Sequence, residues 1–418
     1  MSGVVITGFG VVSPIGLGVD AFSHALRAGA CGVSTIDLFD ASAYRSALGG
    51  QIKADVRTEH ARALCEAAGV PMQTRYGRTA LFSLAALGEA LAMAGLHTEE
   101  LGDGETGLAF GGCTAGTFES EGTLLGLEDG EDYWDIVPPM ELLMTPVGTT
   151  ADVLLSVSGV RGPVSTISTA CSSATNAIGL GLRWINSGRA TRVIVGGADG
   201  LCRLTHCGFN ALRLVSSEVP RPFDARRNGM VIGEGAGVIV LEDAERAAAR
   251  GAIVRGRLLG FGNGAEAHHA TQPRPDGSGA AAAMQAALDD AGMDPCRIEY
   301  INAHGTATQQ NDLTECRGAH LVFGPRAAQM PISSTKSQTG HTLGASGAVE
   351  MAAVLLGMRD GFLPPTVNWG EADPEIALDP VPNVGRAADL GIALSNAFAF
   401  GGNDASLCIA HPDAEVGS

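Results

Sequence analysis

Short runs of β-branched and other apolar residues alternate with alanine-rich segments along most of the chain. Seven of these runs predict short buried strands: Val4–Thr7, Gly107–Phe110, Val164–Ser168, Arg192–Gly196, Val238–Leu241, Tyr300–Asn302 and Ile392–Ser395. Four segments with helical spacing predict helices, several of them apolar on more than one face: Ala80–Ala94, Ser173–Asn186, Gly279–Ala291 and Ala348–Met358. This alternation is typical of an α/β protein with buried sheets.

The length of the chain suits two packed halves better than one core. It has 418 residues, whereas single hydrophobic cores stop growing at about 250–300 residues. The segment Glu242–Arg255 is rich in charge and alanine, follows a predicted strand and suggests a boundary. We therefore expect an N-terminal half at residues 1–255, a C-terminal half at 256–411 and a loose tail at 412–418.

Glycines near the start of the chain allow a different interpretation. The segment Val4–Gly10 looks like the opening of a dinucleotide-binding fingerprint, but the third glycine of that pattern is replaced by Ser13, and no acidic residue follows in the expected strand context. A strand-to-loop turn is the better interpretation. Gly260-Phe261-Gly262 repeats Gly8-Phe9-Gly10 near the start of the second half, which is a weak sign of structural duplication.

Composition and charge exclude several classes of protein. The formal net charge is −18, so no basic stripe is available for nucleic acid. Nine cysteines without any CxxC pair argue against a disulfide framework or a zinc knuckle and favour reduced thiols in the cytoplasm. No apolar run reaches the roughly 18 residues of a membrane span, and the N-terminus lacks the pattern of a signal peptide. We expect neither a nucleic-acid nor a membrane partner.

One cysteine lies in a context that suits a nucleophile. Cys171 stands between the β-branched run that begins at Val164 and the helical segment Ser173–Asn186, with the small neighbours Ala170 and Ser172. At a strand-to-helix turn, the N–H groups and the dipole of the helix favour a thiolate and can hold an oxyanion. A buried, inert residue is the commoner fate of a single cysteine, and packing is the better interpretation of the other eight.

Two histidines lie in loops of small residues. His304 follows the predicted strand Tyr300–Asn302, and His341 lies in the polar, glycine-rich loop Ser333–Gly347, which runs into a helix. Glycines beside a histidine let a ligand or backbone come close. For either histidine alone, a satisfied loop residue is the better interpretation. A metal site formed by these two histidines is disfavoured, because they lack the HxxxH spacing on a helix. The side chains of the adjacent pair His268-His269 would point apart and would not share a site.

Six motifs occur in one order across nearly the whole chain. They are Thr169-Ala170-Cys171-Ser172-Ser173, Arg221-Pro222-Phe223-Asp224, Gly233-Glu234-Gly235-Ala236-Gly237, Asn302-Ala303-His304-Gly305-Thr306, the loop Lys336–Gly347, and Phe398-Ala399-Phe400-Gly401-Gly402. Together they resemble the β-ketoacyl-acyl carrier protein synthases, above all the elongating type II enzymes and the ketosynthase alpha subunits of type II polyketide systems. Any one motif is weak, but six in the order of the family are specific.

The resemblance implies a thiolase-like fold, a five-layered αβαβα sandwich of two related halves that is usually dimeric. It also implies a Cys-His-His site, in which Cys171 takes an acyl group from an acyl carrier protein. His304 and His341 would bind the malonyl thioester, and loss of CO2 would give an enolate that attacks the acyl thioester and extends the chain by two carbons. Such acyltransferases bind no cofactor and use phosphopantetheine thioesters of a carrier. The carrier is expected to be a separate chain, because no Asp-Ser-Leu motif occurs.

Several other residues gain a role only through the resemblance. Lys336 and Glu350 would orient the histidine loops, and Phe400 would gate the pocket and add its backbone N–H to the oxyanion hole. By the same match, Thr306 and Thr308 would be further supporting residues. Thr114 and Phe209 would line the acyl pocket, and Arg213 would contact the carrier protein. Four arginines are weaker candidates for carrier contact: Arg75, Arg78, Arg226 and Arg227. For these four, a solvated surface is the better interpretation. Four further residues match positions that surround a structural monovalent cation in relatives: Asn302, Glu350, Ser395 and Asn396. Buried polar scaffolding is an equally good interpretation of these four.

Some positions depart from the family's usual residues. They are Asn228, Met230, Ala399, Asn403, Asp404 and Thr114. At the position of Thr114, fatty-acid enzymes often place an isoleucine that limits the acyl pocket. A small polar residue there could admit a longer or unsaturated chain, so we favour a specialised polyketide- or polyene-type synthase. Housekeeping fatty-acid elongation remains open.

Two other functions compete with an active ketosynthase. A non-catalytic partner of the chain-length-factor kind typically lacks the nucleophilic cysteine, so Cys171 argues against it. A degradative thiolase would use a second catalytic cysteine rather than a pair of histidines. The chain could form a homodimer or be the active half of a heterodimer with a related subunit.

Overall fold

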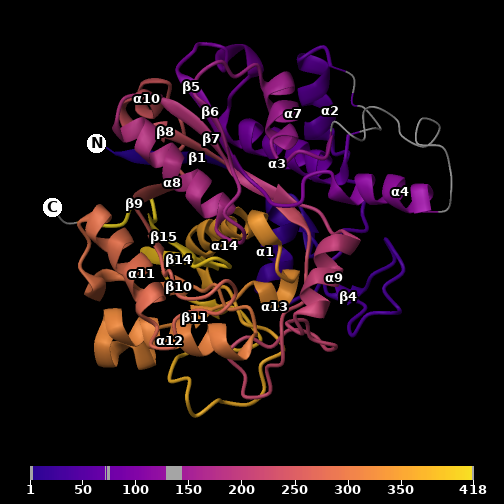
Figure 1. The fold of residues 1–418 in the computed structure, drawn as a ribbon. Coiled ribbons are helices and arrows are strands. Elements are labelled where there is room, and N and C mark those ends of the chain that lie inside the picture. The colour runs from indigo at the N-terminus through magenta and orange to yellow at the C-terminus, as the bar shows by residue number, and fades with distance from the viewer. Residues whose placement is uncertain (1–2, 71, 73–75, 129–143, 417–418) are drawn as a thin grey trace.

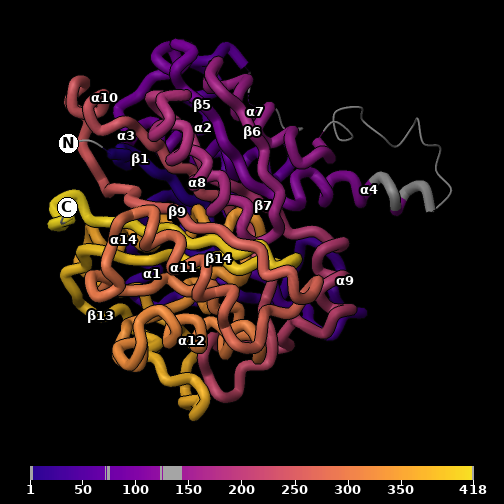
Figure 2. Tube along the Cα trace, turned by 60° about the vertical axis from the view of Figure 1, so that its left-hand side comes forward, coloured from indigo at the N-terminus to yellow at the C-terminus, as the bar shows by residue number. Residues whose placement is uncertain are grey.

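The fold consists of two halves that lie against each other (Figure 1). The computed structural model describes residues 3–70, 72, 76–128 and 144–416. Most of the first half of the chain, indigo to magenta, lies on one side of the molecule and the second half, orange to yellow, on the other, although α1 (Val19–Arg27) and β4 (Leu48–Gly49) lie on the second side. The rotated view in Figure 2 shows the same separation.

Among the described residues, ten strands form two sets of five with the same spatial order. The order is β6-β5-β7-β8-β1 in the first set and β11-β10-β14-β15-β9 in the second. The bounds of the first set are β1 (Val4–Ser13), β5 (Thr106–Gly111), β6 (Val164–Ile167), β7 (Arg192–Asp199) and β8 (Gly235–Asp243). Those of the second are β9 (Gly256–Ala265), β10 (Tyr300–Asn302), β11 (Ile332–Ser333), β14 (Ile392–Ala399) and β15 (Asn403–Ala410).

The strand directions also repeat. In each set the second strand, β5 or β10, runs parallel to both of its neighbours, and the next two pairings are antiparallel. Where the sets meet, β1 and β9 pair antiparallel at Val4, Val5 and Ile6. Identical order and direction are what a structural duplication produces. The remaining strands are short pairs at the periphery: β2 (Gly16–Leu17) with β1, β3 (Ser34–Thr35) with β4 (Leu48–Gly49), and β12 (Phe362–Leu363) with β13 (Arg386–Ala387).

Helices cover both faces of each set and give five layers. Outside the first set lie α2 (Glu59–Ala67), α3 (Arg78–Ala94) and α7 (Thr149–Ser158), and outside the second lie α11 (Ser278–Ala291) and α12 (Gln309–Phe323). Between the sets pack α8 (Ser173–Asn186) and α14 (Ser346–Asp360), whose apolar residues form one core with both. Helices at the edges of the layers are α1 (Val19–Arg27), α4 (Thr117–Glu128), α9 (Arg203–Ala211), α10 (Ala244–Ala249) and α13 (Lys336–Thr339).

All seven predicted strands and all four predicted helices are confirmed as elements, most of them longer at one or both ends. The prediction that every strand is buried is wrong for β6. This strand pairs only with β5 and lies at the edge of the sheet, and the side chain of Val164 is 45% exposed. The interpretation of Gly8 and Gly10 as a strand-to-loop turn is also wrong, because both lie inside β1.

The repeated Gly-Phe-Gly motifs make equivalent contacts in the two halves. A Cβ atom on Gly8 would lie 2.2 Å from the carbonyl oxygen of Ala90 in α3, and one on Gly260 would lie 2.4 Å from that of Ala287 in α11. Each pair of glycines therefore lets a helix backbone lie directly on the first strand of its set. The weak sequence echo thus marks a real structural repeat.

The end of the chain differs from the loose tail that the sequence suggested. Arg257 donates a hydrogen bond to the carbonyl oxygen of Ala414 (2.6 Å), and Arg297 donates one to that of Glu415 (2.6 Å). Ala414 and Val416 also pack against the core of the second half. No helix in the described part of the chain is long and apolar enough to cross a membrane.

Candidate active site

Cys171 lies where β6 turns into α8, at the centre of the molecule. Ala170 adopts a left-handed backbone conformation (φ 51°), which turns the chain sharply before the helix. Ser173 fixes this turn, because its hydroxyl donates to the carbonyl oxygen of Ala170 (2.6 Å) and accepts the N–H of Thr169 (2.9 Å). The cysteine is 6% exposed and sits immediately before the N-terminus of α8.

Two backbone hydrogen bonds fix the position of His341 beside Cys171. Its N–H donates to the carbonyl oxygen of Val231 (2.7 Å), and its carbonyl oxygen accepts the N–H of Gly233 (2.8 Å). The loop then leads into α14, the central helix of the second half, as Cys171 leads into α8 of the first. Its Nε2 atom lies 3.0 Å from Sγ of Cys171.

The protonation of the His341 ring follows from its neighbours. Its Nδ1 atom accepts the backbone N–H of Leu343 (3.2 Å) and lies 2.9 Å from Oγ of Ser346. Because a backbone N–H can only donate, Nδ1 carries no proton and the neutral ring bears its proton on Nε2. The side chain therefore presents an N–H donor toward Sγ.

His304 completes the cluster from the end of β10. Its backbone N–H and that of Gly305 donate to the two carboxylate oxygens of Glu315 in α12 (2.9 and 2.8 Å). Its ring meets that of His341 edge to face, with 5.4 Å between centroids. One side-chain ligand atom from each of Cys171, His304 and His341 lies within 4.8 Å of the others. The structure thus brings together the three residues for which sequence analysis predicted catalysis.

Burial dominates the electrostatics of the three residues. It lowers the pKa values of His304 and His341 well below the ordinary range, and the charge of Lys336 lowers them further, so both rings are neutral. Burial raises the pKa of Cys171 to about 11, although Lys336 and the backbone N–H of Phe400 oppose the rise. Desolvation therefore outweighs the charge of Lys336 and the two backbone N–H groups that favour the thiolate, which favours a thiol at neutral pH.

Lys336 and Glu350 form an ion pair behind the histidines, with side chains only 3% and 2% exposed. Burial raises the pKa of Glu350, and the charge and hydrogen bond of Lys336 oppose this rise. Lys336 begins α13 and Glu350 lies in α14, so the pair ties together the two segments that flank His341. The orienting role that the resemblance implies for them stays a prediction.

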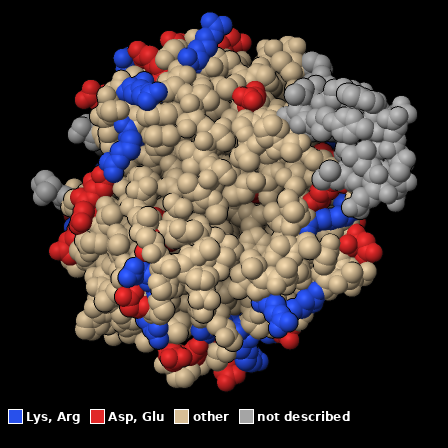
Figure 3. Space-filling model, in the orientation of Figure 1, with Lys and Arg blue, Asp and Glu red and all other residues tan. Residues whose placement is uncertain are grey.

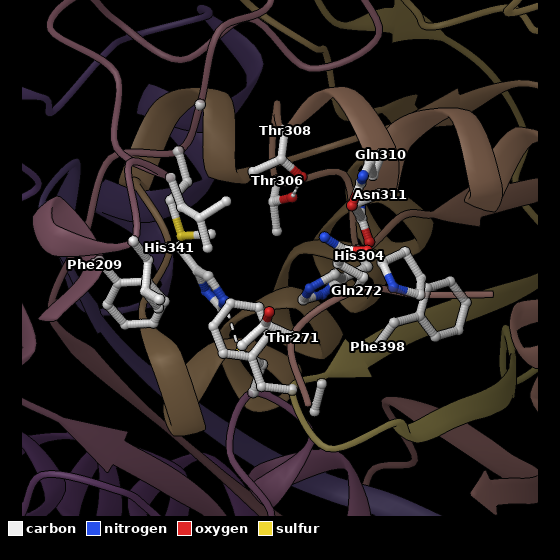
Figure 4. A pocket seen from close by; sticks show the side chains of 18 of the residues that line it. Phe209, Thr271, Gln272, His304, Thr306, Thr308, Gln310, Asn311, His341 and Phe398 are labelled. Atoms are coloured by element: carbon white, nitrogen blue, oxygen red, sulfur yellow. Dashed lines mark hydrogen bonds between the residues drawn. The ribbon is translucent and has the colours of Figure 1, made fainter. Parts of the chain in front are cut away.

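A cavity of about 500 Å³ leads from the surface to the cluster. Figure 4 shows part of its lining, with Thr306 and Thr308 side by side. Their hydroxyl oxygens are 2.9 Å apart. On another wall the ring of Phe209 lies against that of Phe400, with 5.6 Å between centroids. The backbone N–H of Phe400 points to Cys171, which places this loop at Sγ of that cysteine.

Thr114 lies outside this cavity lining. Its hydroxyl and its N–H both donate to Oδ1 of Asp199 (2.8 and 2.7 Å), a fully buried carboxylate at the end of β7. Oδ2 of Asp199 accepts the N–H of Gly344 in the His341 loop (2.6 Å). Thr114 therefore helps to anchor loops of the site, and its contact with an acyl chain stays a prediction.

The arginines proposed for carrier contact differ in their surroundings. Arg213 is exposed at the cavity mouth, just after α9, in the left-handed conformation (φ 57°) that ends the helix. Arg45 lies at the same mouth and was missed by sequence analysis. Figure 3 shows one face of the molecule with a weakly charged centre, and both basic and acidic side chains lie around its edge. The weaker candidates serve the fold or lie outside the described residues: Arg78 pairs with Glu234, Arg226 with Asp224, Arg227 with Asp373, and Arg75 is not described.

The oxygens expected around a monovalent cation only partly converge. Oδ1 of Asn302 and Oε2 of Glu350 are buried and have no hydrogen-bond partner, and Asn302 is the strand neighbour of Ser395. These three fit a small cation that prefers oxygen ligands. The side chain of Asn396 points to the other face of β14, where it donates to Glu315 (3.2 Å).

Sequence analysis missed Asp199 and Glu315, two buried acids that hold the loops of the site. Burial raises the pKa of Glu315 to about 7, against the two N–H groups that it accepts. Both acids act on backbone N–H groups, which leave no sequence signature. The only hint for Glu315 was its place in a polar helix that starts three residues after the His304 motif.

This fold and this buried cysteine–histidine cluster define a condensing enzyme of the thiolase-like class. The sequence matches the family Beta-ketoacyl synthase, N-terminal domain, over residues 1–247 and the family Beta-ketoacyl synthase, C-terminal domain, over residues 255–370. The chain therefore belongs to the β-ketoacyl synthases, which are acyltransferases.

Individual relatives include both a 3-oxoacyl-[acyl-carrier-protein] synthase and a polyketide synthase subunit. The chain is 37% identical to 3-oxoacyl-[acyl-carrier-protein] synthase 2 of Synechocystis, covering 97% of both chains. It is also 37% identical to the tetracenomycin polyketide synthase ketoacyl synthase alpha subunit of Streptomyces glaucescens, covering 98% of this chain and 97% of that one. Among solved structures, the ishigamide ketosynthase/chain length factor superposes with a TM-score of 0.89 at 34% identity, over 98% of this chain and 99% of that chain.

Proposed function

We propose that the chain is the catalytic ketosynthase of a type II system and performs a decarboxylative Claisen condensation. First, the thiol of Cys171 exchanges with the acyl thioester of a carrier protein, which releases the phosphopantetheine thiol. Then malonyl-carrier loses CO2, its carbanion attacks the acyl-Cys171 thioester, and one proton is taken up as the cysteine thiol leaves. The product is a β-ketoacyl-carrier two carbons longer.

The convergence of Cys171, His304 and His341 at the inner end of one cavity carries this proposal. The Nε2–H of His341 and the ring of His304 supply neutral donors for a malonyl thioester oxygen, on which charge develops as CO2 leaves. The N–H of Phe400 serves the other oxyanion, that of the acyl thioester. Lys336 and Glu350 position the histidine loops, and the burial of the site excludes water from the carbanion.

The carrier and its arm fit the mouth of the cavity. Thr306 and Thr308 offer hydroxyls along the path that a phosphopantetheine arm would follow to Cys171. Arg213 and Arg45 present exposed positive charge at the mouth, which suits an acidic carrier protein on a separate chain. No resident cofactor is required, because the thioester arrives on the carrier. Cytoplasmic placement suits these reduced thiols.

A dimer uses the exposed edge of the first strand set. Strand β6 presents unpaired backbone groups at that edge, where the strand of a second chain can add. The partner is a second copy or a related chain-length-factor subunit; the ishigamide relative is itself described as a ketosynthase/chain length factor. We assign residues 1–255 and 256–411 to the two halves, with the nucleophile in the first and both histidines in the second.

Within the family, we favour a specialised polyketide or polyene pathway. Identity does not choose the pathway, since the cyanobacterial synthase and the tetracenomycin subunit are equally similar at 37%. The departures at the gate do favour it: Ala399 and Asp404 alter the loop around Phe400, which an elongating acyl chain must pass. Housekeeping elongation is the alternative.

Intact-mass spectrometry with acyl-carrier and malonyl-carrier proteins tests the reaction. We expect wild type to gain one acyl adduct and Cys171→Ala to gain none. His304→Ala and His341→Ala should still be acylated but should not form the β-ketoacyl product. An adduct on the Cys171→Ala protein would make the nucleophile assignment wrong, and a wild type that is never acylated would favour a non-catalytic partner subunit. The mass of the acyl chain trapped on co-expressed protein identifies the pathway.

A further inference from the structure

Two carboxyl groups lie against each other beside the Phe400 loop. Asp404 is the second residue of β15, and Glu266 directly follows β9. Both line the cavity, they are only 4% and 7% exposed, and their carboxyl groups are hydrogen-bonded to each other. Neither residue has a role in the condensation proposed above.

Each member of the pair also holds a segment of the cavity wall. The carboxyl group of Asp404 accepts the backbone N–H of Ala399, the residue before Phe400. The backbone N–H of Glu266 donates to the carbonyl oxygen of Gly402 (2.9 Å), and its carboxylate accepts the N–H of Arg274 (3.0 Å). The pair therefore links the loop 399–402 to the segment 266–274, which also lines the cavity.

A hydrogen bond between two carboxyl groups requires one proton, because two buried carboxylates in contact repel each other. Burial raises the pKa of Asp404, and the charge of Glu266 raises it further. The neighbouring groups do not replace that proton. Glu315 of α12 adds a third acid, His304 on the β10 loop is neutral, and the guanidinium of Arg274 binds the backbone oxygen of Glu266 (3.1 Å). His269 is the remaining titratable group of the 266–274 segment on the cavity wall.

We propose that Asp404 and Glu266 form a one-proton carboxyl clasp that holds the Ala399–Gly402 loop, and with it the N–H of Phe400, in position at Cys171. This rests on the proposed function, because it deepens the role of the gate in acyl transfer. Asp404 is then a positioning residue that acts through Phe400. Loss of the shared proton separates the two carboxylates and releases the loop.

The clasp predicts a pH response opposite to that of the nucleophile. Thiolate formation at Cys171 makes acyl transfer faster as pH rises, since its pKa is raised to about 11. Deprotonation of the clasp makes transfer slower over the same range. Wild type should therefore pass through a rate maximum as the pH rises from neutral to alkaline.

The test compares wild type with Asp404→Asn and Asp404→Ala in a pH series, with acyl transfer to Cys171 followed by intact mass. Asparagine keeps a hydrogen bond to Glu266 without needing a shared proton. Asp404→Asn should match wild type near neutral pH within about twofold and then gain on it by up to about tenfold per pH unit above the pKa of Asp404. Asp404→Ala lacks the clasp at every pH, so it should be slower than wild type near neutral pH and should approach wild type at alkaline pH. The exposed-site control Asp413→Asn should follow wild type. Profiles of wild type and Asp404→Asn that superimpose would overturn the proposal.

A second readout does not depend on acyl transfer. A carboxyl group whose pKa is raised by folding costs stability increasingly as the pH rises above its unfolded value of about 4. Asp404→Asn should therefore have the same melting temperature as wild type near that pH and a progressively higher one toward neutral pH. If no variant is acylated but this gap appears, the proposed function is wrong while the shared proton stands. If the gap is absent, the clasp is wrong whatever the activity.

Discussion

The backbone N–H of Leu343 donates to Nδ1 of His341 (3.2 Å) and thereby places the ring proton on Nε2, which faces Sγ of Cys171. The donor is part of the main chain, so substitution of the Leu343 side chain would leave it in place. Ser346 is a second neighbour of Nδ1, and its hydroxyl can donate or accept. The orientation of the ring therefore depends on the fold of the loop more than on any single side chain.

Ser346→Ala should affect condensation much less than His341→Ala. The variant loses one buried hydrogen bond worth about 1 kcal/mol, which corresponds to a rate loss below about tenfold. Removal of the imidazole deletes an oxyanion donor and should cost about 10²–10³-fold. The rate of CO2 release from malonyl-carrier measures both. Equal losses in the two variants would show that Ser346, and not the Leu343 N–H, sets the tautomer.

Alkylation of Cys171 should become faster across the whole range from neutral to strongly alkaline pH. Its pKa is raised to about 11 by burial, and only the thiolate reacts with iodoacetamide, so the rate should rise about tenfold per pH unit below that value. Peptide mass spectrometry separates this residue from the exposed cysteines Cys31, Cys207 and Cys296. A rate that levels off near neutral pH would mean that the helix N-terminus outweighs desolvation.

Removal of one partner of the Lys336–Glu350 pair should be more harmful than removal of both. Lys336→Met leaves a buried, uncompensated carboxylate and should lower the free energy of unfolding by about 3–5 kcal/mol. The double variant Lys336→Met/Glu350→Gln should recover most of this loss. Urea unfolding measures the three proteins. If single and double variants lose the same stability, the pair is not coupled.

Sequence reasoning singled out Cys171, His304 and His341, which the structure brings together, because each is surrounded by several informative neighbours. It missed β9 because four glycines between Gly256 and Ala265 disguise a strand that exists through its pairing with β15. It saw Asp404 only as a departure from the family, since its partner Glu266 is distant in sequence. Contacts to backbone groups, such as those of Asp199 and Glu315, depend on the finished fold and could not be inferred from residue types.

A charge on the exposed edge of β6 should weaken the dimer. Val164 is 45% exposed in the single chain, and Val164→Lys places an ammonium group where the second chain is expected to pack. Sedimentation velocity at several concentrations should show a higher proportion of monomer than in wild type. Ile253→Lys is the matched control, because Ile253 is 64% exposed in the loop that precedes β9. Equal effects of both variants would rule out β6 as the interface.

The duplicated glycines provide the last prediction. Gly8→Ala and Gly260→Ala each force a methyl group to within 2.2 and 2.4 Å of a helix carbonyl oxygen, which neither strand nor helix can avoid without moving. Each should lower the free energy of unfolding by at least about 2 kcal/mol, because overpacking against backbone strains both elements. Gly264→Ala, also in β9, is the control: nothing lies within 4 Å of its Cβ, and the change should stay within about 0.5 kcal/mol. Chemical denaturation measures all three. If Gly8→Ala were costly and Gly260→Ala harmless, the two helix–strand contacts would not be equivalent, and the repeat would be one of topology alone.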